Sequence, residues 1–295
     1  MSPYVADPVY LNGQFLPLNE AHISPLDRGF LYGDGVYEII PVYSRRAFRI
    51  DEHLNRLAAT LAGVKLTNPL DLADWKAVIE KLIAAAPWED QSVCLQVTRG
   101  ADNKRDHAFP PASVLSTSFA FSSPMLTPSA EVRAQGVAAI TVPDQRWARC
   151  DLKVISLLAN VLARQQAVEG GCAEALLIRD GYLKEGAASN IFVVKNGVLL
   201  APPKTPLMLP GITYDVVLEL AECYGQRLEI REISENELRS ADEVWMTSST
   251  KEILAITTLD GQPVGNGPNA GKPGPVGKIM WQWYQDFKNT IMRKG

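Results

Sequence analysis

The sequence contains little cysteine or histidine and has no excess of basic residues. Four cysteines are scattered through 295 residues without a Cys-x-x-Cys pair, and three histidines accompany them. A structural zinc site or a disulfide framework needs clustered cysteines or histidines, so neither is indicated and no metal site is expected. The 29 basic residues do not outnumber the 33 acidic ones, and the formal net charge is −4. Such a balance argues against a nucleic-acid partner.

Long apolar runs are also missing. No segment approaches the roughly 18 uninterrupted apolar residues of a membrane-spanning helix. The N-terminus lacks the basic start and apolar stretch of a secretory signal. With the dispersed cysteines, this pattern predicts a cytoplasmic protein with no membrane partner. The chain is 46% hydrophobic, which is ample for two modest cores.

Strand and helix patterns alternate along the chain, which predicts an α/β fold in two domains. The stretch 122–130 combines two prolines with small polar residues between two strand patterns. Such a composition is typical of an interdomain linker. We therefore expect residues 1–121 and residues 131–295 to form the N-terminal and C-terminal domains.

Local signals predict several element boundaries. Asn12-Gly13 between apolar triplets predicts an N-terminal hairpin, because both turn residues tolerate positive φ. Residues 48–50 read as a return strand. Asp51 and Ser156 are each expected to cap a helix, since their side chains can accept a hydrogen bond from the first turn.

Two segments carry the strongest functional signal. Residues 149–156 read Arg-Cys-Asp-Leu-Lys-Val-Ile-Ser, and residues 183–192 read Leu-Lys-Glu-Gly-Ala-Ala-Ser-Asn-Ile-Phe. Together they resemble the signature of the class IV aminotransferases, which are fold type IV pyridoxal 5′-phosphate (PLP) enzymes. The resemblance implies that Lys153 binds PLP through its amine and moves the substrate proton, and that Glu185 contacts the pyridine nitrogen. A carboxylate there keeps the nitrogen protonated, so that the ring accepts electrons.

Taken alone, each of these two residues has an ordinary interpretation. Most lysines are solvated surface charges, and Glu185 before a glycine is typical of a turn. The two segments in this order favour the catalytic interpretation. Because both residues are intact, a degenerate cofactor-binding protein is disfavoured.

Three further segments match the family's phosphate contacts. Residues 209–213 precede a predicted helix, whose N-terminal N–H groups suit a phosphate, and residues 247–252 supply hydroxyls after a predicted strand. Considered alone, each fits a helix cap or a turn equally well. In the segment 51–57, the resemblance implies that Arg56 turns toward the phosphate, whereas His53 is expected to be structural. The implied cofactor-binding residues are Lys153, Glu185, Arg56, Leu209, Ile212, Thr213, Ser249 and Thr250.

Within the family, the chain resembles the bacterial D-amino-acid aminotransferases, from about residue 9 to about residue 260. In that branch a tyrosine, an arginine and a histidine bind the substrate α-carboxylate, which implies this role for Tyr37, Arg105 and His107. An arginine offers a planar donor fork for a carboxylate. The chain departs from the pattern in two ways, because the loop before Arg105 is one residue longer and Asp106 adds a negative charge. The segments that carry the resemblance are 27–38, 96–100, 105–110 and 146–153.

The resemblance implies fold type IV, with a smaller N-terminal α/β sandwich domain and a larger C-terminal α/β barrel-like domain. It implies PLP-dependent, ping-pong transamination between a D-amino acid such as D-alanine or D-glutamate and a 2-oxo acid such as 2-oxoglutarate or pyruvate. A branched-chain L-amino-acid aminotransferase, an (R)-selective amine transaminase and an aminodeoxychorismate lyase remain open alternatives. The preferred donor and acceptor also remain open. Family members are usually homodimers in which the loop that carries Arg105 serves the neighbouring subunit, so a homodimer is expected.

Overall fold

The computed structural model describes residues 4–294. The chain divides into two compact units, and the first of them takes up two segments from later in the sequence. The first unit contains the chain up to Met125, Leu152–Leu157 and the end from Met292, and the second contains Leu126–Asp151 and Leu158–Ile291.

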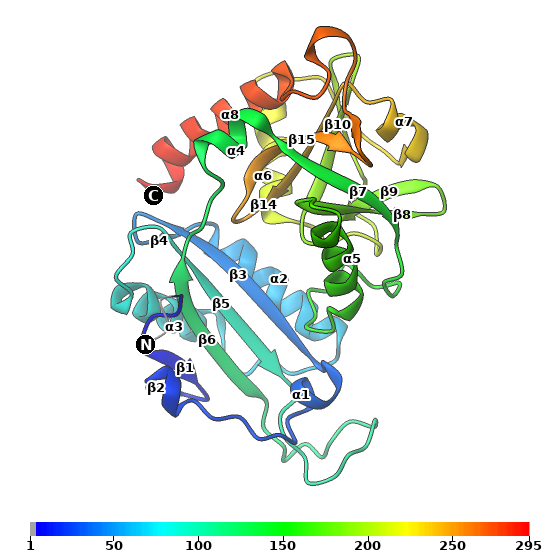
Figure 1. Cartoon of the computed structure of the whole chain (residues 1–295). Helices are drawn as coiled ribbons and strands as arrows, with labels where there is room; N and C mark the ends of the chain where they lie inside the picture. Colours follow the sequence, from blue (N-terminus) through cyan, green and yellow to red (C-terminus); the bar gives the residue numbers. More distant parts are fainter. Residues whose placement is uncertain (1–3, 295) are drawn as a thin grey trace. The chain divides into compact units, whose positions relative to one another are not determined.

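The first unit is an antiparallel sheet with helices packed on one face (Figure 1). Its strand order is β2-β1-β6-β5-β3-β4. The strands are β1 (Val9–Leu11), β2 (Gln14–Leu16), β3 (Gly35–Tyr43), β4 (Arg46–Ala47), β5 (Gln91–Thr98) and β6 (Thr117–Pro124). The helices are α1 (Arg28–Tyr32), α2 (Ile50–Gly63) and α3 (Leu72–Ala85).

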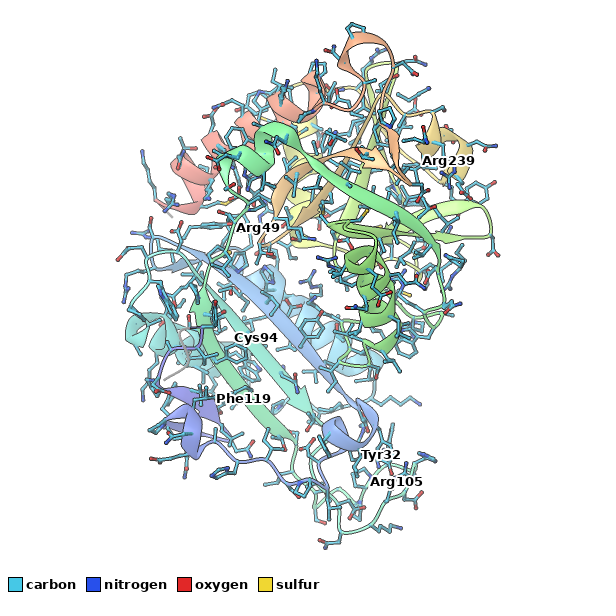
Figure 2. All side chains as sticks on the ribbon, viewed as in Figure 1. Tyr32, Arg49, Cys94, Arg105, Phe119 and Arg239 are labelled. Carbon is cyan, nitrogen blue, oxygen red and sulfur yellow. The ribbon has the colours of Figure 1, made fainter. Side chains whose placement is uncertain are left out.

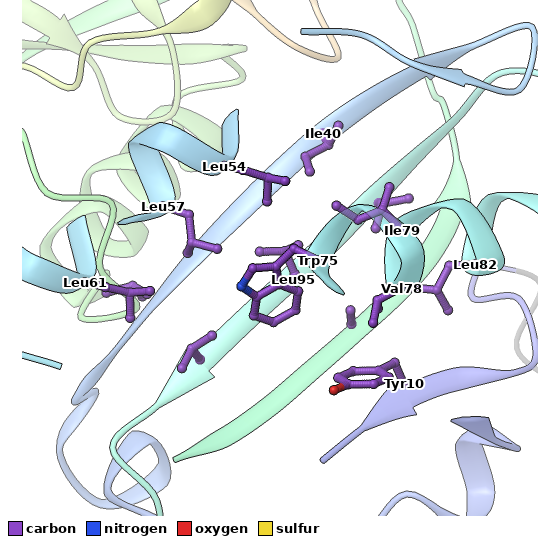
Figure 3. Close-up of a cluster of buried hydrophobic side chains, with 14 of the residues drawn as sticks. Tyr10, Ile40, Leu54, Leu57, Leu61, Trp75, Val78, Ile79, Leu82 and Leu95 are labelled. Carbon is purple, nitrogen blue, oxygen red and sulfur yellow. The ribbon is translucent and has the colours of Figure 1, made fainter. Parts of the chain in front are cut away.

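The core of this unit lies between the sheet and helices α2 and α3 (Figure 3). Leu54, Leu57 and Leu61 recur at helical spacing along α2 and are buried. Trp75 of α3 is buried in the same cluster and donates a hydrogen bond from its indole to Asn68 at 2.9 Å. Burying a large apolar side chain contributes about 1.5–3 kcal/mol, so this cluster holds the helices firmly against one side of the sheet.

The second unit is built on a mixed sheet in the order β12-β11-β10-β14-β15-β7-β8-β9-β13, with β16 paired to β15. Phe192, Tyr214 and Trp245 stack in its interior, with ring centroids 5.0 and 5.7 Å from that of Phe192. The strands are β7 (Val137–Pro143), β8 (Glu174–Arg179), β9 (Tyr182–Gly186), β10 (Asn190–Lys195), β11 (Val198–Ala201), β12 (Leu228–Ile230), β13 (Ile233–Ser234), β14 (Glu243–Ser248), β15 (Glu252–Leu259) and β16 (Gln262–Pro263). The helices are α4 (Ala130–Gln135), α5 (Leu158–Glu169), α6 (Ile212–Cys223), α7 (Glu235–Arg239) and α8 (Pro275–Phe287).

The α/β class and the N-terminal hairpin expected from the sequence are confirmed. β1 and β2 pair around Asn12-Gly13, and both turn residues have positive φ. In the stretch 122–130, β6 continues to Pro124 and α4 begins at Ala130, and the division between the two units falls after Met125. Within residues 4–294, no helix combines the length and apolar character needed to cross a bilayer.

Three expected boundaries are wrong. Helix α2 begins at Ile50, so Asp51 lies in its first turn, where a carboxylate favours the helix dipole, and does not cap it. The early start of α2 also removes the return strand expected at residues 48–50, and β4 ends at Ala47. Helix α5 begins at Leu158, and the Ser156 hydroxyl instead donates a hydrogen bond to the carbonyl of Gly33 at 2.7 Å.

Candidate active site

Lys153 lies on a short segment that extends the edge of the first unit's sheet. The amide of Tyr37 donates to the Lys153 carbonyl at 3.0 Å, and Val154 pairs with Val36. Because side chains alternate along a strand, Val154 and Val36 enter the apolar core, whereas Lys153 and Tyr37 share the opposite face. The Lys153 ammonium lies 4.1 Å from the centre of the Tyr37 ring. The register therefore joins two expected site residues that are far apart in the sequence.

The same face of the sheet continues onto β5. Tyr37 is opposite Gln96, and Ile39 is opposite Cys94, which is labelled in Figure 2. Burial raises the pKa of the Cys94 thiol to about 11, so this thiol is protonated at neutral pH. Cys94 therefore does not compete with the Lys153 amine as a nucleophile.

Arg56 is held by a buried carboxylate on the helix side of the sheet. Its Nε and Nη2 donate to the two oxygens of Glu38 at 2.7 and 2.8 Å, and His53 Nδ1 lies 2.8 Å from the same carboxylate. Burial alone would raise the pKa of Glu38, but Arg56 and His53 lower it to about 2. Burial also lowers the pKa of His53, so the imidazole is neutral. Arg56 is thus a cation held in place by a side chain that the sequence did not single out as a site residue.

Arg105 and His107 lie together on the exposed loop between β5 and β6. Both pack against Tyr32 of α1, with the Arg105 guanidinium 5.2 Å and the His107 ring 5.3 Å from the centre of the Tyr32 ring (Figure 2). The Asp106 carboxylate accepts from the amide of Ala108 at 3.1 Å, and the ammonium of Lys104 lies 3.3 Å from it. The Asp106 carboxylate, which lies between Arg105 and His107, is therefore bound by groups of its own loop.

Glu185 forms the centre of a polar cluster in the second unit. It is buried at the end of β9 and forms an ion pair with Arg146, which is also held by Asp144 at 2.9 Å. Burial raises the pKa of Glu185 to about 7, although Arg146 opposes the rise. The amide of Leu209 donates to both Glu185 oxygens, at 3.2 and 3.3 Å. The carboxylate therefore has a fixed orientation.

Asn190 connects this carboxylate to the start of helix α6. Its side-chain amide donates to the carbonyl of Leu209 at 3.0 Å and lies 3.4 Å from Glu185. A Cβ on Gly211, the N-cap of α6, would lie 2.1 Å from the Asn190 oxygen, so a larger residue there would displace the Asn190 side chain. Asn190 is also opposite Thr247 in the pairing of β10 with β14.

These groups suit a bound phosphate. In the described part of the chain no side chain caps α6, so the first amide groups of the helix, at Ile212 and Thr213, suit an anion. The Thr247 hydroxyl is buried and has no hydrogen-bond partner within residues 4–294. Ser249 and Thr250 form the half-buried turn that follows β14. A PLP phosphate would satisfy amide and hydroxyl donors of this kind.

The structure thus groups the expected site residues into four sets. Lys153 is beside Tyr37 in the first unit, and Arg105 is beside His107 on a loop of that unit. Asn190 contacts Glu185 and Leu209 in the second unit. Ile212 and Thr213 open helix α6 just after Leu209, and Ser249 and Thr250 follow Thr247, the strand partner of Asn190. Arg56 lies on α2, bound to Glu38.

Sequence reasoning missed residues that hold others in place. Arg146 and Asn190 both fall inside the segments that carried the resemblance, as does Glu38. That position was the only available signal, because their partners lie far away along the chain.

Comparison with known proteins places the chain in a family. Residues 35–259 match the family model "Amino-transferase class IV". The chain is 39% identical to a D-alanine aminotransferase of Bacillus licheniformis, over 92% of this chain and 93% of that relative. It is 35% identical to a D-alanine aminotransferase of Listeria innocua, over 97% and 96%.

Two similar solved structures are of branched-chain amino acid aminotransferases and not of D-alanine aminotransferases. A branched-chain amino acid aminotransferase of Escherichia coli matches with a TM-score of 0.88 and 27% identity, over 95% of this chain and 94% of that one. A second branched-chain amino acid aminotransferase, solved with pyridoxamine 5′-phosphate, matches with a TM-score of 0.87 and 26% identity, over 98% and 95%.

The chain belongs to the class IV aminotransferases. The α/β fold expected from the sequence is that of the fold type IV members of this family, and the protein is an aminotransferase.

Proposed function

We propose that this chain catalyses PLP-dependent transamination between a D-amino acid and a 2-oxo acid. The observation that carries the proposal is the placement of Lys153 beside Tyr37, at a half-buried edge of the sheet. The relatives named D-alanine aminotransferase, with up to 39% identity, support the D-amino acid as substrate.

Lys153 would supply the amine that binds the cofactor and, once released, would move the substrate proton. When bound, PLP supplies an electron sink for the carbanion that forms at the substrate Cα. The ring of Tyr37, whose centre lies 4.1 Å from the Lys153 nitrogen, limits the directions from which the amine reaches a substrate. A positioned amine of this kind serves as a general base once it is neutral.

Glu185 would hold the proton on the ring nitrogen of a bound cofactor. Arg146, Asn190 and the Leu209 amide orient the carboxylate, so that it accepts a hydrogen bond without first rearranging. Arg56, the amides of Ile212 and Thr213, and the turn at Ser249 and Thr250 would hold the phosphate. The donor set is dominated by backbone amides and hydroxyls, as expected for a dianion.

Arg105, His107 and Tyr37 bind the substrate α-carboxylate in this proposal. We assign Arg105 and His107 to the site of the partner subunit of a homodimer, as in the usual arrangement of the family. Lys153 and Arg105 of one chain would then serve the two different active sites of the dimer. Four cysteines, all free, support the cytoplasm as the compartment.

A branched-chain L-amino acid is the second candidate substrate, because the similar solved structures are branched-chain aminotransferases. The identity to these proteins, 26–27%, is lower than the 39% to the D-alanine enzyme. The D-amino acid is therefore preferred.

A half-reaction panel tests the proposal. Purified holoenzyme is mixed separately with D-alanine, L-alanine, L-leucine, (R)-1-phenylethylamine and aminodeoxychorismate, and loss of the lysine-bound cofactor's absorption band is followed. D-alanine should bleach the band fastest, and pyruvate should appear. Faster reaction with L-leucine would instead identify the second candidate. Borohydride reduction and peptide mapping should place the pyridoxyl group on Lys153, and its appearance on another lysine would overturn that assignment.

A further inference from the structure

Arg28 binds the backbone of the loop that carries Arg105 and His107. Its Nη1 donates to the carbonyls of Asp106 and Ala108 at 2.6 and 3.1 Å, and its Nη2 donates to the carbonyl of His107 at 3.3 Å. Arg28 is buried, whereas the loop residues 103–109 are exposed. One buried guanidinium therefore holds three consecutive carbonyls of an otherwise exposed loop.

Arg28 is itself fixed to the sheet. Its Nε donates to Asp34 at 2.8 Å, and Arg99 at the end of β5 donates to the same carboxylate at 2.8 Å. Arg99 also lies 3.9 Å from the centre of the Phe109 ring, farther along the loop. The loop is thus tied to two adjacent parts of the first unit's framework, the end of β5 and the turn that follows α1.

Tyr32 orients the side chains on the same loop. Its ring contacts the guanidinium of Arg105 on the loop and that of Arg28, which lies 4.9 Å from the ring centre. The ring of His107 packs against it as well. The Tyr32 hydroxyl is buried and has no hydrogen-bond partner within residues 4–294. The contacts of Tyr32 are therefore made by the ring and not by the hydroxyl.

We propose that Arg28 and Tyr32 are positioning residues that fix Arg105 and His107 for capture of the substrate α-carboxylate. Arg28 fixes the loop backbone directly after Arg105, and Tyr32 fixes the two side chains. This inference rests on the proposed function. It also explains how the Arg105 guanidinium is held in a defined place on a loop one residue longer than the family pattern. Arg28 binds the carbonyls of residues 106–108, which directly follow Arg105.

Cleavage by trypsin tests the backbone part of the proposal without any substrate. Lys104 and Arg105 are exposed on the loop, and trypsin cleaves after both residue types. In the holoenzyme, Arg28→Lys keeps the charge but loses the planar fork, so local opening and nicking at these sites should become about tenfold faster. Arg45 provides a matched control, because its guanidinium also donates to three carbonyls, at 2.9–3.2 Å, elsewhere in the same unit. Arg45→Lys should leave nicking at the loop unchanged.

Kinetics with D-alanine test the effect on substrate capture. Arg28→Lys and Tyr32→Leu should raise the apparent KM for D-alanine about tenfold or more, since small displacements of a binding group are costly. The kcat and the absorption band of the bound cofactor should change little, because Lys153 and Glu185 are untouched. Tyr32→Phe keeps the ring and should retain the wild-type KM.

The outcomes separate this proposal from the proposed function. If wild-type enzyme turns over no D-amino acid, the proposed function fails, and KM is then compared on the amino acid that it does accept. If Arg28→Lys does not fold, the comparison of Tyr32→Leu with Tyr32→Phe decides. Nicking and KM values in Arg28→Lys and Tyr32→Leu that match those of Arg45→Lys and Tyr32→Phe would show that neither residue positions the loop.

Discussion

Glu185 is a buried carboxylate whose charge depends on its neighbours. Burial alone favours its neutral form, and the ion pair with Arg146 opposes this. A bound, protonated ring nitrogen would add a second positive partner and favour the ionised form further. The residue is therefore prepared for a cationic ligand.

Replacing Glu185 with Gln should slow proton transfer by about ten- to a hundredfold. The change removes one charged hydrogen bond, which is worth about 1.5–3 kcal/mol. The measurement is the single-turnover rate with D-alanine. Glu243→Gln is the control, since Glu243 is also a buried glutamate of the second unit but accepts its bonds from the amides that open α8. A Glu185→Gln rate equal to wild type would contradict the assigned role.

Glu38 should contribute a pH-dependent part of the stability. Its folded pKa is about 2, below the ordinary value of 4.5, so the unfolded chain binds its proton more readily. The stabilisation is present above pH 4.5 and is lost as pH falls toward 2. It amounts to about 3 kcal/mol, because a tenfold difference in proton affinity between the folded and unfolded states corresponds to about 1.36 kcal/mol.

Glu38→Gln should therefore unfold at lower denaturant concentration than wild type at pH 7, with a gap that narrows below pH 4.5. Denaturation of apoenzyme at pH 7, 5, 4 and 3 measures the gap. A gap that is constant across this range would show that the Glu38 carboxylate is not the source.

At the scale of elements, the start of α6 depends on one close contact. Gly211 approaches Asn190 so closely that a methyl group would displace the Asn190 side chain, and Asn190 in turn contacts Glu185 and Leu209. Moving this helix start displaces amides that the proposal assigns to the phosphate. The same contact also joins the start of α6 to the Glu185 carboxylate.

Gly211→Ala should weaken cofactor binding, with the dissociation constant for PLP rising about tenfold, equal to about 1.4 kcal/mol. Titration of apoenzyme with PLP measures the change. Gly170→Ala is the control, because a Cβ there meets its nearest atoms at an ordinary 3.5 Å. Equal PLP affinities in both variants would mean that Asn190 moves aside without cost.

Local sequence signals predicted which elements form better than they predicted the residues at which those elements begin and end. The hairpin at Asn12-Gly13 formed as expected because its turn chemistry is contained in two residues. Asp51 and Ser156 did not cap their helices, since α2 starts earlier, at Ile50, and the Ser156 hydroxyl bonds Gly33 instead. A cap is decided by which partner the side chain meets in the folded chain, and that partner can be far away in sequence.

At the scale of the whole molecule, the proposed homodimer has a direct test. Lys153→Ala and Arg105→Ala chains should each be nearly inactive alone. When they are co-expressed, a mixed dimer in which the loop serves the partner's site contains one intact site. Random pairing should then restore about a quarter of wild-type activity, from one site in half of the dimers. No recovery in an isolated mixed dimer would mean that the loop serves its own chain.

The sequence by itself determined the family and the two main chemical groups. Lys153 and Glu185 lie in short contiguous sequence motifs, so the sequence alone was sufficient to propose their roles. The leucines of α2 recur at helical spacing and mark its buried face. These signals survive because they depend on neighbouring positions in the chain.

Only the tertiary structure decided which residues hold those groups in place. The contact of Lys153 with Tyr37 follows from the register of an added edge segment with β3. Other contacts also join residues well separated in sequence. They are the hydrogen bonds of Arg28 to the loop at 106–108, the ion pair of Arg146 with Glu185 and that of Arg56 with Glu38. Hydrogen bonds and ion pairs depend on distance and direction in space, and these are set by strand register and packing and not by spacing along the chain.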